Sequence, residues 1–85
     1  MAIDSLLWDL EDDPEGNVKH CAEHGVTMEE VEEVFQNVSD ADISRTSGRP
    51  VVFGDTHTGR HLMVVFEVID ESTAYPVTAY EVRRK

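Results

Sequence analysis

The hydrophobic pattern of the chain changes its period once, at about residue 40. Before that point apolar residues recur three and four positions apart, which is the spacing of one face of a helix. Beyond it apolar and polar residues alternate, which is the spacing of a half-buried strand. The pattern predicts a single domain over residues 1–85, with a helical half at about 1–40 and a sheet half at about 41–82.

Two helices are expected in the first half. Asp13 is a candidate N-cap, and Pro14 fits the first helical position. Gly25 is suited to end this helix in a left-handed conformation. The second helix opens with Thr27 and Glu30, which have the spacing of a capping box. Its apolar stripe consists of Val31, Val34, Phe35 and Val38.

The second half predicts an antiparallel meander of about four strands. These are Asp42 to Thr46, Pro50 to Thr56, His61 to Ile69 and Tyr75 to Val82. In the third strand, one set of alternate positions is purely apolar and is expected to face the helices. This set is Leu62, Val64, Phe66 and Val68. Ser5 to Trp8 is short and apolar, and a small strand is one interpretation of it. The expected fold class is α+β, with two N-terminal helices packed on an antiparallel sheet of about four strands.

The charge of the chain is distributed unevenly. Its formal net charge is −11, from 18 acidic and 7 basic residues. Residues 1–42 contain 13 acids and one base, whereas residues 43–85 contain 5 acids and 6 bases. Phosphate contacts from basic residues supply most of the affinity of nucleic-acid-binding proteins. RNA binding would therefore have to use the second half, while the first half would repel RNA or attract a basic partner.

Nothing along the chain predicts export, a membrane span or a bound cofactor. Residues 1–10 lack a basic segment and a long apolar run, and the longest apolar run, Leu62 to Phe66, is too short to span a bilayer. Cys21 is the only cysteine, which fits a reducing cytoplasm. His20 and His24 have a spacing that can bind zinc, but no further ligands follow at metal-type spacing. We therefore expect neither a metal nor a cofactor.

Several short motifs are spread along nearly the whole chain. They are Trp8-Asp9, His24-Gly25-Val26, Glu29 to Phe35, Gly54, Thr58-Gly59-Arg60, Val64-Val65-Phe66 and Val77-Thr78-Ala79. As a set, and in this order of elements, they resemble the BrnT family of the broad RelE-like group. The resemblance implies a RelE-like fold, ribonuclease toxin activity and neutralisation by a partner antitoxin.

The resemblance also implies a site of basic side chains on the exposed sheet face and its rim. By position, Arg60 matches the Gly-Arg after the hairpin turn, and His24 matches the His of His-Gly-Val. Arg83 and Arg84 match the basic end of the last strand. Tyr80 stands where the family usually carries an arginine. The acidic net charge is a second departure, because the family is generally basic.

RNA cleavage of this type needs proton transfer and stabilisation of the scissile phosphate. Arg60 could bind phosphate through its planar guanidinium, or instead pair with one of the many acids. The histidines His24, His57 and His61 could exchange protons near neutral pH, and Tyr80 could donate one. The catalytic candidates are thus Arg60, His24 and Tyr80, and the RNA-binding candidates are Arg60, Arg83, Arg84 and His61.

Two hypotheses follow for the function. One is a ribonuclease toxin paired with an antitoxin. The other is a toxin-like fold without catalysis that binds a protein partner, which could be basic, or RNA. An apolar, incompletely covered stretch of sheet would favour a protein partner or a homodimer. Its candidate residues are Met63, Val65 and Ile69.

Overall fold

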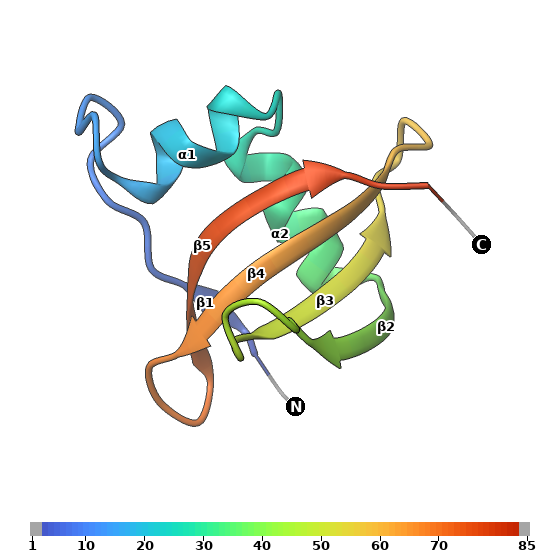
Figure 1. The fold of residues 1–85 in the computed structure, drawn as a ribbon. Helices are drawn as coiled ribbons and strands as arrows, with labels where there is room; N and C mark the ends of the chain where they lie inside the picture. The colour runs from blue at the N-terminus through green and yellow to red at the C-terminus, as the bar shows by residue number, and fades with distance from the viewer. Residues whose placement is uncertain (1–2, 84–85) are drawn as a thin grey trace.

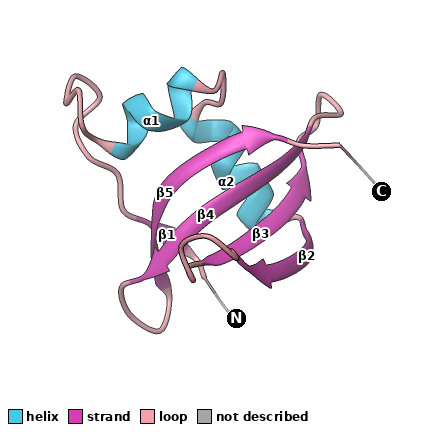
Figure 2. Ribbon diagram, in the orientation of Figure 1, coloured by secondary structure: helices cyan, strands magenta, loops and turns pink. Residues whose placement is uncertain are grey.

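The structure is a computed structural model that describes residues 3–83 and has an α+β architecture of two helices and one five-stranded mixed sheet (Figure 1). The elements are β1 (Ser5–Leu6), α1 (Asn17–Glu23), α2 (Met28–Gln36), β2 (Val38–Ile43), β3 (Pro50–Asp55), β4 (His61–Val68) and β5 (Thr73–Glu81). The strands lie in the order β1-β5-β4-β3-β2, so that β1 and β2 form the two edges (Figure 2).

The predicted four-stranded antiparallel sheet behind two N-terminal helices is wrong. A fifth strand, β1, precedes both helices and pairs in parallel with the start of β5, where Ser5 lies opposite Thr73. Its two residues are too few to show a hydrophobic period, so the sequence pattern alone cannot place this strand in the sheet. The remaining four strands are sequential and antiparallel.

Two predicted starting points differ from the structure by three or four residues. α1 begins at Asn17 after Gly16, because Asp13 is used in a turn in which its carboxylate accepts a hydrogen bond from the Glu15 amide at 3.0 Å. β2 begins at Val38, four residues before the predicted start. It is exposed along its whole length, so burial does not impose a clear alternation on its sequence.

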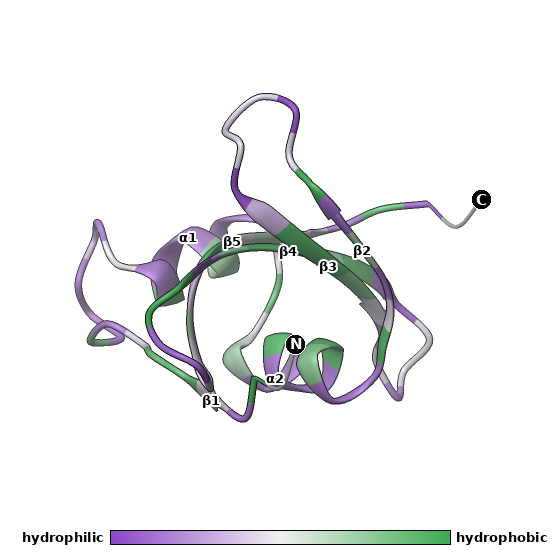
Figure 3. Ribbon diagram, turned by 90° about the horizontal axis from the view of Figure 1, so that it is seen from below, coloured by the Kyte–Doolittle hydropathy of each residue, from purple (hydrophilic) through white to green (hydrophobic). Residues whose placement is uncertain are grey.

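The capping box at the start of α2 is confirmed. The Thr27 hydroxyl accepts from the Glu30 amide at 3.1 Å, and the Glu30 carboxylate accepts from the Thr27 amide at 3.0 Å. The helix lies in the concave side of the curved sheet, which arches over it in Figure 3. At Gly54 of β3, an added Cβ would lie 2.8 Å from the Asn37 carbonyl oxygen and 3.0 Å from that of Val34. Only glycine therefore lets β3 approach the end of α2 this closely.

The hydrophobic core lies between this concave side and the two helices. Phe66 and Leu62 are its largest fully buried side chains. The predicted inward set of β4 is confirmed at Leu62, Val64 and Phe66, whereas Val68 at the end of the strand is half exposed. The buried core residues are Cys21, Val26, Val31, Val34, Val52, Leu62, Val64, Phe66, Ala74 and Ala79. The opposite, convex face of the sheet is the one that faces the viewer in Figure 1.

A polar network attaches α1 and the N-terminal segment to β5. The Asn17 side chain is buried, accepts from the Asp9 amide at 2.9 Å and donates to the Leu7 carbonyl at 2.9 Å. The Asp9 carboxylate accepts from the Asn17 amide and from the Tyr75 hydroxyl. The hydrogen bond to Asp9 raises the pKa of Tyr75 to about 12, and the same bond lowers the pKa of Asp9.

We predict that this network makes stability depend on pH at the alkaline end. A tyrosine whose pKa is about 12 when folded and about 10 when unfolded contributes stability that is present below about pH 10 and lost as pH rises toward 12. The ionisation of Tyr75 can be followed by ultraviolet absorbance in a Tyr80→Phe background, where it is the only tyrosine. Asp9→Asn should lower the pKa of Tyr75 toward 10, and an unchanged Tyr75 titration would contradict the network.

Candidate functional site

Arg60 is the strongest candidate for a phosphate-binding residue, and it is held by contacts within the protein. It follows a tight turn in which the Thr56 amide donates to the Arg60 carbonyl at 2.9 Å, with Gly59 at a φ of 87°. Its guanidinium donates to the Glu30 carboxylate at 2.6 Å, and to that of Glu81 at 3.3 Å. The contact with Glu30 is the shortest ion pair of the described residues.

A third acceptor completes the surroundings of this guanidinium. The Gly25 carbonyl, in the turn between the helices, accepts from Arg60 Nη1 at 3.0 Å. Hydrogen bonding to Glu30 raises the pKa of Arg60. Partial burial opposes ionisation of Glu30, but the Thr27 amide and Arg60 hold its pKa below the ordinary value. Arg60 is therefore a charged structural group whose charge is balanced by two carboxylates, and it fits the alternative interpretation made from the sequence.

The other two catalytic candidates lie next to each other. His24 follows the last turn of α1, and its ring centre is 5.5 Å from that of Tyr80 on β5, with the planes tilted by 53°. Because Arg60 bonds the carbonyl of Gly25, the residue after His24, the structure brings the three candidates to one region. In this region His24 and Tyr80 have access to solvent, but the Arg60 guanidinium is already bonded to carboxylates of the protein.

The fold does not bring the predicted RNA-binding residues together on one surface. His61 is bonded through Nδ1 to the Asp55 carboxylate at 2.8 Å and stacks on Phe53. Arg83 lines a hollow of about 400 Å³ on the convex face together with Asp40, Asp55 and other acidic or polar residues. Arg84 lies outside the described residues. The described basic candidates are thus each placed among carboxylates, and the structure brings together no purely basic surface from them.

The hollow that contains Arg83 carries more negative than positive side chains. Its lining is Ser39, Asp40, Asp42, Phe53, Asp55, His61 and Arg83. Three of these are acids, against one arginine and one histidine. The convex face near β2 is therefore suited to a cation or a basic peptide rather than to phosphate. Within residues 3–83, no group of three or more His, Cys, Asp or Glu side chains is arranged to hold a metal ion.

An apolar groove lies on the other side of the same edge strand. It has a volume of about 380 Å³ and runs between β2, β3 and the end of α2. Its apolar lining consists of Ile3, Phe35, Val38, Ala41, Ile43, Pro50, Val51, Val52 and Phe66. Two of these side chains remain well exposed, Val38 at 46% and Ile43 at 58%. Exposed aliphatic residues beside a groove are typical of a surface that binds another protein.

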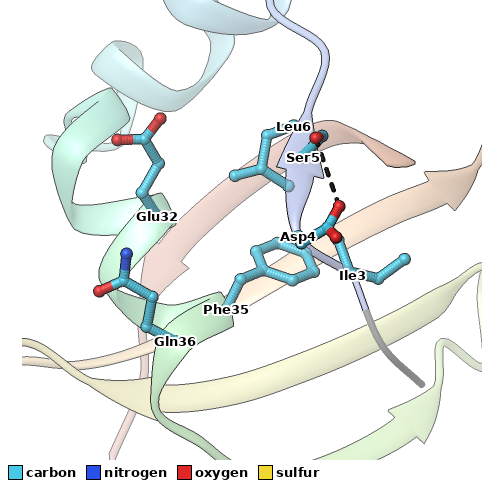
Figure 4. A pocket seen from close by; sticks show the side chains of 7 residues that line it. All are labelled: Ile3, Asp4, Ser5, Leu6, Glu32, Phe35 and Gln36. Atoms are coloured by element: carbon cyan, nitrogen blue, oxygen red, sulfur yellow. Dashed lines mark hydrogen bonds between the residues drawn. The ribbon is translucent and has the colours of Figure 1, made fainter. Parts of the chain in front are cut away.

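A smaller hollow continues this groove toward β1. It has a volume of about 260 Å³ and shares Ile3 and Phe35 with the groove. Figure 4 shows the Phe35 ring between the N-terminal segment and α2, with Glu32 and Gln36 projecting from the helix beside it. The apolar surface is therefore bordered by polar side chains where it reaches β1.

Sequence reasoning missed the partners of Arg60 and the role of β2. The spacing of Thr27 and Glu30 predicts only the capping role of Glu30, although its carboxylate bonds both the Thr27 amide and Arg60. Glu81 and Arg60 are 21 positions apart, and their contact depends on the register of β4 and β5. No local pattern in the sequence predicts the register of β4 with β5. Val38, the first residue of β2, also fits the apolar stripe of the second helix, so the sequence does not mark the start of this strand.

The comparisons with known proteins leave the family open. No protein-family model, curated protein or solved structure matches this chain. Among residues 3–83, the helices are too short and too polar to cross a membrane.

We predict that the ion pair between Arg60 and Glu30 stabilises the fold measurably. A double-mutant cycle with Arg60→Ala and Glu30→Ala, measured by urea unfolding, should give a coupling energy of about 1–2 kcal/mol, because both groups are largely shielded from solvent. The matched control is Arg49 and Glu67, which are 3.8 Å apart and more exposed. Their coupling should be about 0–0.5 kcal/mol. Equal coupling in the two pairs would contradict a structural role for Arg60.

Proposed function

We propose that this chain is a protein-binding module without ribonuclease activity. The observation that carries the proposal is the exposed apolar groove beside the edge strand β2, where Val38 and Ile43 are 46% and 58% accessible. Small monomeric proteins seldom leave such a groove uncovered unless it has a binding role. A partner that covered it would remove apolar surface from water without any change in the fold.

The balance of charge around Arg60 argues against catalysis on RNA. A phosphate would have to compete with Glu30 at 2.6 Å and Glu81 at 3.3 Å for the guanidinium, and both carboxylates would repel it. The net charge of −11 adds a general repulsion toward a polyanion. A basic or apolar protein surface meets neither obstacle.

The resemblance to BrnT-type toxins is compatible with this proposal as an inferred origin. A toxin of this kind has two properties: it cuts RNA, and it is bound by an antitoxin. We propose that the second kind of function is retained here and that the first is lost. Tyr80 at the position of the usual arginine and the pairing of Arg60 with two carboxylates both support that view.

A ribonuclease remains the second candidate because of one observation. His24 and Tyr80 approach each other with ring centres 5.5 Å apart, and the guanidinium of Arg60 bonds the adjacent Gly25 carbonyl. A histidine and a phenol can transfer protons during cleavage of a phosphodiester. For this function, a substrate phosphate would have to displace at least one carboxylate from Arg60.

Induced expression in bacterial cells separates the two candidates. We predict that the wild-type protein, soluble and at high level, leaves growth and total RNA unchanged. Purified protein incubated with single-stranded RNA at low salt should likewise leave the RNA intact.

His24→Ala with Tyr80→Phe provides the control, because both side chains reach the surface and neither belongs to the buried core. Growth arrest with RNA breakdown in the wild type, relieved in this double variant, would refute the proposal in favour of a ribonuclease. Identical intact RNA in both strains is the result that the proposal requires.

A further inference from the structure

β2 is an edge strand with two different sides. Its outer neighbour position in the sheet is empty in the described chain, since the strand order ends β4-β3-β2. Asp40 and Asp42 line the acidic hollow on the convex face. Ala41 and Ile43 line the apolar groove on the helix side, which Asp42 also borders. A strand laid along β2 would meet carboxylates with one set of alternate side chains and aliphatic groups with the other.

The hydrogen bonds of the β2–β3 ladder show which backbone groups are available. The Ser44 amide donates to the Arg49 carbonyl at 2.7 Å, and Asp42 lies opposite Val51 in the same register. Antiparallel pairs alternate between bonded and non-bonded, so Asp42 directs its amide toward β3. Ala41 and Ile43 therefore direct their amides and carbonyls away from the sheet.

The two outward amides are covered by the side chains that precede them. The Asp40 carboxylate accepts from the Ala41 amide at 2.9 Å, and the Asp42 carboxylate accepts from the Ile43 amide at 2.8 Å. An exposed edge strand can pair with other chains, and charged side chains on it reduce this risk. Here the same two carboxylates cover the amides and supply negative charge beside them.

From these observations we infer that β2 binds a partner segment as an added strand, in which lysine or arginine alternates with aliphatic residues. A basic side chain of the partner would draw the Asp40 and Asp42 carboxylates toward itself and release the Ala41 and Ile43 amides for pairing. The aliphatic residues would enter the apolar groove on the other side. This inference rests on the proposed protein-binding function and specifies its partner.

Charge complementarity selects this occupant over a second copy of the chain. Pairing of β2 with β2 would bring Asp40 and Asp42 of both copies onto one face, where like charges opposite each other are destabilising. The net charge of −11 on each copy would add to the repulsion. A basic strand turns the same arrangement into an attraction.

A synthetic peptide with blocked ends, in which four lysines alternate with three valines, is a suitable probe. Binding is measured on the full chain by NMR titration of the backbone amides. We expect the Ala41 and Ile43 amides to shift most, and the affinity to exceed by about tenfold that for a peptide of the same composition with lysines and valines in two blocks. An alternating peptide of glutamate and valine should not bind.

Two variants separate the charge from the backbone. Asp40→Asn with Asp42→Asn keeps an oxygen beside each amide but removes both charges, and it should weaken binding by about five- to tenfold. Ala41→Pro removes one outward amide without touching the bonds to β3, and it should weaken binding by at least about tenfold. Ala41→Ser retains the amide and should bind as the wild type does.

Besides a failure of the alternating peptide to bind, three results would overturn the inference. They are equal affinity for the alternating and block peptides, undiminished binding by Ala41→Pro, and concentration-dependent shifts of Ala41 and Ile43 without peptide. The last would identify a second copy as the occupant. If the peptide does not bind and RNA stays intact, the added-strand inference is refuted, but the proposed lack of ribonuclease activity still stands. Cleavage of RNA would instead refute the proposed function itself.

Discussion

One guanidinium joins parts of the chain that lie far apart in sequence. Arg60, at the turn between β3 and β4, contacts the Gly25 carbonyl between the helices, Glu30 of α2 and Glu81 of β5. The single group thus connects both helices to the sheet at the end of β5. Glu30 takes part twice, because its carboxylate also caps α2 through the Thr27 amide. Loss of this arginine would leave two carboxylates close together without a compensating charge.

The same contacts govern what the protein can do. Arg60, which the sequence suggests as a phosphate-binding candidate, instead bonds two carboxylates and a carbonyl of the protein, and His24 and Tyr80 lie beside it. The apolar groove and the acidic hollow lie along the edge strand β2. There the chain presents apolar residues on one side and carboxylates on the other. In this account the acidic charge assists recognition of a basic partner, whereas it would obstruct cleavage of RNA.

Local signals in the sequence predicted the elements that local interactions build. The capping box of Thr27 and Glu30 and the alternation along β4 are examples, since each depends on residues close together in the chain. β1 has only two residues and shows no hydrophobic period, so pattern alone could not place it in the sheet. Asp13 accepts a hydrogen bond within a turn and does not cap α1, and the pattern could not distinguish these two roles. The site was harder to predict, because the pairing of Arg60 with Glu81 depends on strand register across 21 positions. The sequence could suggest Arg60 as a candidate but could not show that its charge is balanced.

The most direct test of this account is the state of the Arg60 guanidinium in solution. NMR detection of arginine Nε–Hε groups can compare Arg60 with Arg45, whose side chain is exposed in the loop between β2 and β3. The account predicts that the Arg60 Hε exchanges with water much more slowly than that of Arg45, and that inorganic phosphate or single-stranded RNA leaves its resonance unchanged. Exchange as fast as that of Arg45, with a shift on addition of phosphate, would show a free guanidinium and contradict the account.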